Sequence, residues 1–284
     1  MRRGAYIRIG GLVLGNFDIH RVQSEVRGII SEKLSLEFRS FAVRSHDTSG
    51  HRGFNSLVND IGHIVKEEFP KSVVNLESPE VVFIAMVHGN EVLLGITLRG
   101  SQSARWYPRR PRAKPFFHPS ALYPKFARAL VNLARVREGE LIMDPFCGTG
   151  SILTEASCVG ANSLGIDVSM KMCRGAIKNL NFLKLPFIDV LNADATHIPF
   201  VRVDGVATDI PYGRCASTLG QSSANLLNGF MDSVNDRLKK DRYCCIVHPS
   251  NVELNSTASF EVIEDHHIYV HRNLTRIVSI LRRN

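Results

Sequence analysis

Apolar and polar positions in the first third of the chain follow a pattern typical of a small α+β module. Residues 38–45, FRSFAVRS, alternate like a strand. Residues 54–69 carry apolar side chains at helical spacing, and Asn55 is placed to cap that helix. Residues 81–98 hold two apolar runs around a turn at 88–91, which predicts a hairpin. The residues before this first strand give no secure assignment.

The rest of the chain alternates short apolar strands with amphipathic helices. Three strands end at Asp144, Asp167 and Asp209, and another ends just before Asp194. Helices are predicted at 119–135, 151–159, 169–183 and 222–239, and later strands at 243–248, 260–270 and 275–281. This order predicts an α/β fold with a Rossmann-like, doubly wound parallel sheet. The last two strands flank residues 271–273 and predict a closing antiparallel hairpin.

A strand-to-helix turn with two glycines forms the first candidate ligand site, DPFCGTGS at 144–151. Gly148 and Gly150 allow the backbone to approach a ligand, and the following helix N-terminus offers N–H groups to a carboxylate. A dinucleotide loop would carry a third glycine, which is missing here, and Asp144 would repel a pyrophosphate. The loop suits S-adenosylmethionine, whose ammonium Asp144 can face. The alternative is a turn that binds no ligand.

Two further acids extend this site. Asp167 lies at the tip of the second strand, where an acid can accept hydrogen bonds from both ribose hydroxyls. Asp194 follows the third strand and could accept a hydrogen bond from the adenine amino group. A helix-capping role for Asp194 is the open alternative.

The sequence DIPYG at 209–213 is the candidate catalytic loop. A base amino group is a weak nucleophile, because its lone pair is delocalised into the ring. Acceptors that hold its two hydrogens favour the tetrahedral geometry needed for attack. Asp209 and the Ile210 carbonyl can be those acceptors, Pro211 stiffens the loop, and Tyr212 can stack on the base. The alternative is an ordinary turn after a strand.

Charge distribution points to a nucleic-acid partner. The formal net charge is +8 with a pI near 9.3, and no acidic residue lies between Glu91 and Glu138. The stretch carries ten basic residues: Arg99, Arg105, Arg109, Arg110, Arg112, Lys114, Lys125, Arg128, Arg135 and Arg137. Four aromatics interleave them: Trp106, Tyr107, Phe116 and Phe117. This mixture suits phosphate contacts and base stacking; the alternative is a solvated linker whose aromatics pack on the second domain.

Composition narrows the function classes without deciding among them. The 284 residues leave room for two domains, and 44% hydrophobic and 22% charged residues are ordinary for a globular protein. No apolar run reaches the length of a membrane span, so we expect no membrane association. The six cysteines lack zinc-site spacing and indicate reduced thiols in the cytoplasm. No metal is expected.

These motifs together resemble the class I methyltransferases with an (N/D)PPY-type amino-methyltransferase motif. The chain is most similar to the archaeal and eukaryotic tRNA guanine-N2 methyltransferases that act at position 10 and carry an RNA-binding THUMP domain. The resemblance covers PFFHPSALYPKFARALVNLARV, DPFCGTGSILTEA, LGIDVS, NADAT and DIPYG; FAVRS and VNLESPEVVFIAMVHGNEVLLGITL resemble the later part of a THUMP domain. Ile210 departs from the family, which usually has a proline there.

The resemblance implies a domain plan and a set of site residues. The plan is a THUMP-like RNA-binding domain with a shortened N-terminal region at 1–104, a basic linker at 105–117 and a methyltransferase domain at 118–284. The catalytic residues would be Asp209, Ile210, Pro211 and Tyr212. The cofactor-binding residues would be Asp144, Phe146, Gly148, Gly150, Asp167, Val168, Asp194 and Ala195. The tRNA-binding residues would be Arg105, Arg109, Arg110, Arg112 and Lys114.

Three other functions stay open at this point. One is amino-methylation of ribosomal RNA guanine or DNA adenine, and another is RNA binding by a methyltransferase fold that no longer catalyses. A nucleotide-dependent oxidoreductase is disfavoured by the missing glycine. The sequence also leaves open the number of methyl groups transferred, a small activating protein partner and the oligomeric state.

Overall fold

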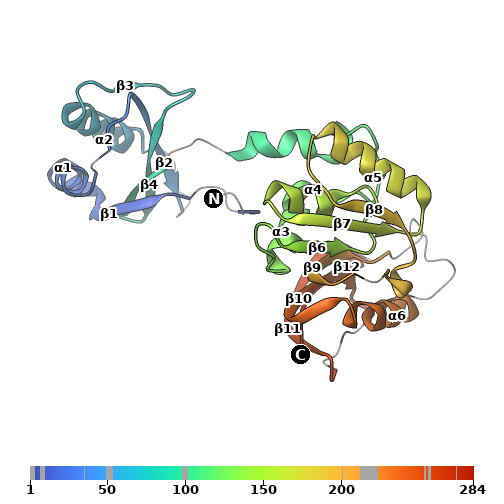
Figure 1. Cartoon of the computed structure of the whole chain (residues 1–284). Coiled ribbons are helices and arrows are strands. Elements are labelled where there is room, and N and C mark those ends of the chain that lie inside the picture. The colour runs from blue at the N-terminus through green and yellow to red at the C-terminus, as the bar shows by residue number, and fades with distance from the viewer. Residues whose placement is uncertain are drawn as a thin grey trace. The chain divides into compact units, whose positions relative to one another are not determined.

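The computed structural model describes residues 4–6, 10–34, 36–48, 54–97, 102–199, 201–211, 223–252, 254, 257–272 and 274–284 (Figure 1). The chain divides into two compact units. The smaller unit is Ile7–Ala104, and the larger unit combines Met1–Tyr6 with Arg105–Asn284.

The smaller unit is a five-stranded sheet with two helices, in the strand order β1-β5-β4-β2-β3. Its elements are β1 (Leu12–Asp18), α1 (Val22–Lys33), β2 (Ser40–Asp47), α2 (Asn55–Glu68), β3 (Val73–Val74), β4 (Val81–His88) and β5 (Glu91–Thr97). The predicted strand, helix and hairpin are therefore confirmed. The capping role predicted for Asn55 is wrong, because Phe54 is the N-cap residue and no side chain caps the helix.

Both helices of the smaller unit pack their apolar faces on the sheet. Ile30 of α1 and Ile61 of α2 are fully buried with Phe41 and Phe83 in a single core cluster. The rings of Phe41 and Phe83 meet edge to face at 6.1 Å, the arrangement that the ring quadrupoles favour. Alternate residues of β2 and β4, such as Phe41 with Val43 and Phe83 with Ala85, thus form the sheet face on which the helices pack.

The larger unit holds a seven-stranded sheet in the order β11-β12-β10-β9-β6-β7-β8. Its strands are β6 (Leu141–Asp144), β7 (Asn162–Asp167), β8 (Asp189–Asn192), β9 (Val203–Asp209), β10 (Leu238–Pro249), β11 (Phe260–His271) and β12 (Leu274–Arg283). Its helices are η2 (Gln102–Arg109), η3 (Pro111–Ala113), α3 (Pro124–Leu133), α4 (Ser151–Cys158), α5 (Met170–Phe182), η4 (Ala195–His197) and α6 (Ser223–Asn235). Strands β6 to β10 pair in parallel, and β12 runs antiparallel to β10 and β11. The predicted doubly wound sheet with a closing hairpin is confirmed.

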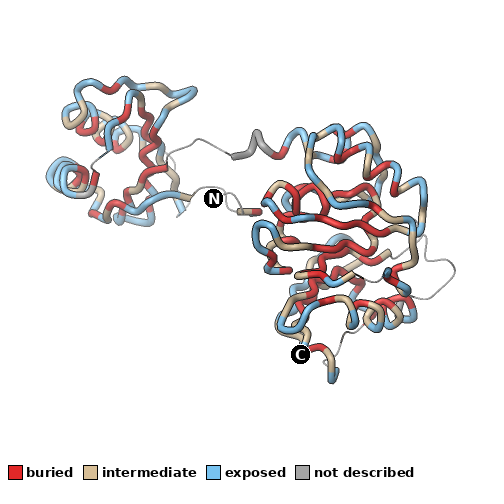
Figure 2. The backbone as a smooth tube through the Cα atoms, viewed as in Figure 1, coloured by how far each residue is buried: buried red, intermediate tan, exposed pale blue. Residues whose placement is uncertain are grey.

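Helices cover both faces of this sheet, as Figure 1 shows for α5 and α6. Side chains in β6 alternate between the two layers: Ile142 packs with Leu130 of α3, and Met143 packs with Phe230 of α6. The central strands are accordingly largely buried (Figure 2). Burial on both faces explains why these strands read as continuous apolar runs.

The structure shifts the boundary of the helix predicted at 119–135, because α3 begins at Pro124. Tyr123 is extended, with φ −69° and ψ 144°, as the residue before a proline tends to be. His118 Nδ1 and the Ser120 hydroxyl form a hydrogen bond of 2.7 Å, which accompanies a turn in the residues before α3. Residues 118–123 thus form a connection in front of α3.

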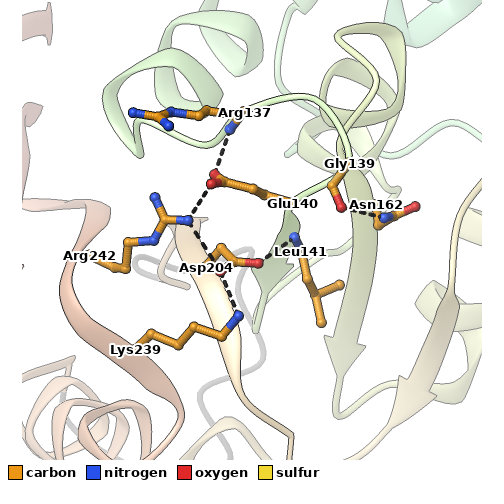
Figure 3. Close-up of polar contacts among 8 residues, drawn as sticks. All are labelled: Arg137, Gly139, Glu140, Leu141, Asn162, Asp204, Lys239 and Arg242. Atoms are coloured by element: carbon orange, nitrogen blue, oxygen red, sulfur yellow. Dashed lines mark hydrogen bonds and ion pairs between the residues drawn. The ribbon is translucent and has the colours of Figure 1, made fainter.

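An ionic network ties together the amino-terminal ends of the central strands (Figure 3). The Arg242 guanidinium bonds the carboxylates of Glu140 and Asp204, and Lys239 Nζ lies 2.7 Å from Asp204 Oδ1. Asp204 Oδ2 in turn accepts a hydrogen bond of 2.9 Å from the Leu141 backbone N–H. The network joins β6, β9 and β10 at the edge of the sheet opposite the candidate ligand loop.

Candidate functional site

Three carboxylates gather at the carboxyl ends of neighbouring strands. Asp144 ends β6, Asp167 ends β7 and Asp209 ends β9, in a sheet where β6 lies between the other two. Burial raises the pKa of Asp144 to about 7, and the nearby charges of Asp167 and Asp209 contribute to that rise. A concentration of negative charge at this edge favours a ligand that carries positive charge.

Asp144 is the most enclosed of the three, with a relative exposure of 2%. Its Oδ1 accepts hydrogen bonds from Thr208 Oγ1 at 2.7 Å and from the Phe146 backbone N–H at 3.2 Å. Both contacts fix the carboxylate at the start of the glycine loop. They also lower its pKa, but by less than burial raises it.

Asp167 fixes the glycine loop itself. Its Oδ2 accepts a hydrogen bond of 2.9 Å from the Gly148 N–H, and its Oδ1 accepts one of 2.8 Å from the Ser169 N–H. Each carboxylate oxygen can accept a second hydrogen bond. The predicted contact of Asp167 with ribose hydroxyls is therefore compatible with its structural role, and it stays a prediction.

The two loop glycines serve different purposes. Gly148 has φ +50°, and a Cβ built on it would meet no atom closer than 4.0 Å. Gly150 has φ +77°, and its Cβ would lie 3.1 Å from that of Ala176 on α5. Both need a left-handed backbone, but only Gly150 is required for packing. The open space beside Gly148 is compatible with the predicted ligand, whose binding stays a prediction.

The remaining predicted cofactor residues surround this edge. Asp194 caps η4, since its Oδ1 accepts hydrogen bonds from the Thr196 N–H at 2.9 Å and from the Thr196 hydroxyl at 2.8 Å. The capping alternative is thus present, and an adenine contact stays a prediction. Val168 is exposed beside Asp167, Ala195 is buried, and the Phe146 ring packs against Phe230.

The predicted catalytic loop leaves the sheet at Asp209. The Ile210 N–H donates a hydrogen bond of 3.1 Å to the Val247 carbonyl, and the Ile210 side chain is almost fully buried. Pro211 is half-buried. Tyr212 lies outside the described residues. The strand ladder therefore holds Ile210, and through it the backbone on which Asp209 is mounted.

Arg276 of β12 also reaches this site, although sequence reasoning did not predict it. Its Nη1 lies 3.9 Å from Asp209 Oδ2, and both side chains are largely covered. Its position directly before the apolar residues Ile277 and Val278 of β12 was the signal that could have singled it out.

The basic segment 105–117 is attached to the rest of the larger unit through a buried ionic cluster. Glu155 of α4 lies 2.6 Å from Arg109 Nε and 2.7 Å from Arg128 Nη2. Trp106 is buried, with the two guanidinium groups 5.1 and 5.6 Å from its ring centre. For Trp106, packing on the larger unit thus replaces the predicted exposure to nucleic acid. Glu155, the only acid in α4, was a signal missed in the sequence.

The predicted RNA-binding residues of this segment differ in their surroundings. Lys114 is buried, its Nζ lies 3.5 Å from Ser151 Oγ, and burial lowers its pKa to about 8. Arg110 and Arg112 are exposed, and they lie over the rings of Tyr107 and Phe117, which are themselves exposed. The side chain of Arg105 is outside the described part of the chain. RNA contact stays a prediction, and the exposure of Arg110 and Arg112 is compatible with it.

Two kinds of feature are absent from the part of the chain that the structure describes. Within those residues, no group of His, Cys, Asp or Glu is arranged to hold a metal ion. No helix of that same part of the chain is long and apolar enough to span a membrane.

Comparison with known proteins shows the family to which this chain belongs. Residues 111–277 match the family model described as RMKL-like, methyltransferase domain. The chain is 34% identical to the tRNA (guanine(10)-N2)-dimethyltransferase of Methanothermobacter thermautotrophicus, over 86% of this chain and 73% of that protein. It is 32% identical to the protein of the same name from Pyrococcus abyssi, over 95% of this chain and 82% of the other.

A solved structure has the same fold. The crystal structure of TrmN from Thermus thermophilus matches 99% of this chain and 85% of its own length, with a TM-score of 0.54 and 20% sequence identity.

Proposed function

Because this chain belongs to the family of RMKL-like methyltransferase domains, we propose that it transfers methyl groups from S-adenosylmethionine to the exocyclic N2 amino group of a guanosine in tRNA. The observation that carries the proposal is the placement of Asp209 beside Asp144 and Asp167 at one edge of the sheet. Position 10 is the proposed nucleotide, since relatives that share 30–34% of their residues with this chain are named for it.

The residues at this edge fit S-adenosylmethionine. The space beside Gly148 admits a ligand, and the N-terminus of α4 that follows can bind the methionine carboxylate. Asp144 would face the ammonium, Asp167 the ribose and Asp194 the adenine, with Val168 and Phe146 beside them. When bound, the cofactor supplies an electrophilic methyl group on a positively charged sulfur, so a site with three nearby carboxylates suits it.

Asp209 and Ile210 would hold the target amino group. The Asp209 carboxylate and the Ile210 carbonyl accept its two hydrogens, which directs the nitrogen lone pair towards the methyl group. The proton released on transfer passes to an acceptor at this site or to water. Positioning of the amino group, with water excluded, is the main contribution that these residues make to the rate.

The hydrogen bond of Ile210 argues against a fold that has lost its catalytic function. A proline at this position would stiffen the loop but could donate no N–H. Here the Ile210 N–H bonds Val247 and its side chain packs in the core, so the first residues of the motif, Asp209 and Ile210, are held in place by another means. The departure from the family pattern therefore preserves the support of Asp209.

RNA binding is proposed for two regions. We propose that the smaller unit is a THUMP-like RNA-binding domain, and that Arg110 and Arg112 of the basic segment contact phosphates. The target guanosine must leave its base stack, because an N2 amino group cannot reach an enclosed site from within a helix. The five cysteines that the structure describes are free thiols, which fits the cytoplasmic location that we also propose.

Methyl transfer to unmodified tRNA tests the proposal. The purified chain is incubated with labelled S-adenosylmethionine and an unmodified transcript, and the modified nucleoside is identified by mass. We expect N2-methylguanosine or its dimethyl form, and the mass tells the two apart. Asp209→Asn is expected to abolish transfer while cofactor binding changes only a few fold. Label on adenosine would support the adenine alternative. Activity of the chain alone would show that no activating partner is required.

A further inference from the structure

Strand β11 ends and strand β12 begins at the same edge of the sheet as the catalytic loop. In the register of β9 and β10, Asp209 pairs with Val247. Two residues later β10 ends at Pro249, which pairs with Arg276 of β12. Because β12 runs antiparallel to β10, the residues before Arg276 continue past the end of β10 at the carboxyl edge. The tip of the hairpin, by which we mean Tyr269, Val270, His271 and Arg272, thus lies at the same edge of the sheet as the candidate site.

Arg276 connects this hairpin to the catalytic loop, because its guanidinium lies 3.9 Å from Asp209 Oδ2. On β11, Tyr269 pairs with Thr275, the next position along β12 beyond Arg276. One position along a strand is about 3.4 Å, so Tyr269 is mounted within a few ångströms of the level of Arg276, at a position of the opposite sheet face. A ligand that reaches Asp209 from this side would meet the tip.

The tip has the composition of a nucleic-acid contact. Tyr269 is 73% exposed and Val270 is 43% exposed, and His271 and Arg272 are exposed beside them. No acidic residue follows Asp265 in the sequence, and Arg272 and Arg276 lie at or next to the tip. An exposed aromatic ring next to an arginine suits a stacked base with its phosphate. A surface that binds another protein would instead be expected to present a contiguous apolar patch.

We propose that the β11–β12 tip binds the RNA strand that adjoins the target guanosine, with Tyr269 stacked on an unpaired neighbouring base and Arg272 on a phosphate. This inference rests on the proposed function, since it names a part of the substrate that the same site would hold. The hairpin adds a contact that holds the extruded guanosine near Asp209. It belongs to neither the smaller unit nor the basic segment.

The test compares a double variant of the tip with a matched double variant at the opposite edge. Tyr269→Ala with Arg272→Ala removes the stacking ring and the charge. Phe182→Ala with Lys240→Ala removes an exposed ring at the end of α5 and an exposed charge near the start of β10, at the amino-terminal edge. Binding of unmodified tRNA, methyl-transfer rates and cofactor affinity are measured for both full-length variants and the wild type.

The tip variant is expected to show a decrease of about tenfold or more in kcat/KM for tRNA, with unchanged cofactor affinity. Its salt dependence of tRNA binding should weaken by about one phosphate, a log–log slope change of roughly 0.7–0.9. The control variant should behave as wild type. Equal decreases in both variants, or none in the tip variant, would overturn the proposal. A change of oligomeric mass in the tip variant, with normal tRNA binding, would also overturn it and would assign the hairpin to an interface between copies.

These outcomes are separate from those of the proposed function. If the wild type binds tRNA without methylating guanosine, the proposed function fails, and tRNA affinities of the two variants still decide the role of the tip. If the wild type methylates guanosine and the tip variant does so equally well, only the inference about the hairpin fails.

Discussion

At the scale of single residues, the burial of Asp144 is the most informative property of the site. A carboxylate that is 2% exposed is costly to ionise, and its pKa of about 7 reflects this cost. Hydrogen bonds from Thr208 and Phe146 offset part of this cost, and a cation bound beside Asp144 would offset more of it. If the proposed cofactor contact is made, Asp144 would therefore link cofactor binding to the loss of a proton near neutral pH.

Replacing Asp144 by Asn should stabilise the free protein and weaken cofactor binding. Asn Oδ1 can accept the same hydrogen bonds from Thr208 and Phe146, and it carries no charge to bury. At pH 8 we expect a gain on the order of 2–4 kcal/mol in the free energy of unfolding. Cofactor affinity should fall by roughly 1.5–3 kcal/mol, the contribution of a hydrogen bond to a charged group. Urea denaturation and calorimetry measure the two effects.

The pH dependence of that gain has a definite sign. The pKa of Asp144 is raised from 3.8 to about 7 on folding, so the folded state binds more protons than the unfolded state between these values. The wild type therefore loses stability as the pH rises from about 4 to about 7, and the Asn variant lacks this loss. A difference between the two proteins that is constant across this window would refute the burial of an ionisable Asp144.

At the scale of elements, Glu155 fixes the basic segment to α4. Glu155 and Arg128 are both almost fully buried, and Arg109 completes the cluster. Glu155→Gln leaves the Arg128 charge buried without its partner, and we expect a loss of about 3–5 kcal/mol of stability. The control is Glu264→Gln, which removes an exposed pair with Arg135 and should cost about 0–1 kcal/mol. Similar decreases in both variants would show that burial does not decide the effect.

The network in Figure 3 should make the amino-terminal edge of the sheet sensitive to acid. Burial by itself would raise the pKa values of Glu140 and Asp204, but hydrogen bonds from Arg242, Lys239 and the backbone lower both overall. Glu140 and Asp204 thus make their full contribution to stability at a pH above their unfolded pKa values of 4.5 and 3.8. This contribution is lost as the pH falls through their lower pKa values in the folded state.

Arg242→Met should therefore flatten the acid limb of the stability curve. The variant removes the cation that Glu140 and Asp204 share, so both pKa values rise towards their unfolded values. Denaturation by urea at a series of pH values from about 7 down to about 3 measures this. An acid limb as steep as that of the wild type would show that other carboxylates cause it.

At the scale of the whole molecule, the basic segment is expected to act on RNA without acting on the cofactor. Replacing Arg110 and Arg112 together by Ala should weaken tRNA binding and reduce the log–log salt slope by about 0.7–0.9 for each phosphate that is no longer bound. Arg109 is left in place, because it belongs to the buried cluster. Cofactor affinity should not change. Filter binding over a range of salt concentrations is the measurement, and an unchanged slope would exclude direct binding of phosphates by these two arginines.

The sequence predicts much of the larger unit, because its elements are short and their signals are local. Apolar runs that end in an acid, such as LIMD and GVATD, become buried strands whose acids meet at one edge. Residues 12–33 could not be assigned, since β1 and α1 depend on pairing and packing with elements far along the chain. The start of α3 was misplaced because Tyr123, before Pro124, is extended, while a contact between His118 and Ser120 accompanies a turn ahead of it.

Contacts between residues that are far apart in the sequence could not be predicted from the sequence. Glu155, as the only acid of α4, indicates a need for a cation, but it does not identify Arg109 and Arg128 as its partners, because that contact depends on how the basic segment folds over α4. The approach of Arg276 to Asp209 likewise depends on the register of β10 and β12. The order of motifs predicted which residues share an edge, but not which side chains support them.

Methyl transfer to a tRNA that lacks a single amino group is the sharpest test of the proposed chemistry. Two unmodified transcripts differ only at position 10, where one carries guanosine and the other inosine, which has no N2 amino group. The wild-type chain should transfer methyl groups to the first and none to the second, while it binds both with similar affinity. Equal transfer to both transcripts would contradict methylation of the N2 amino group at this position.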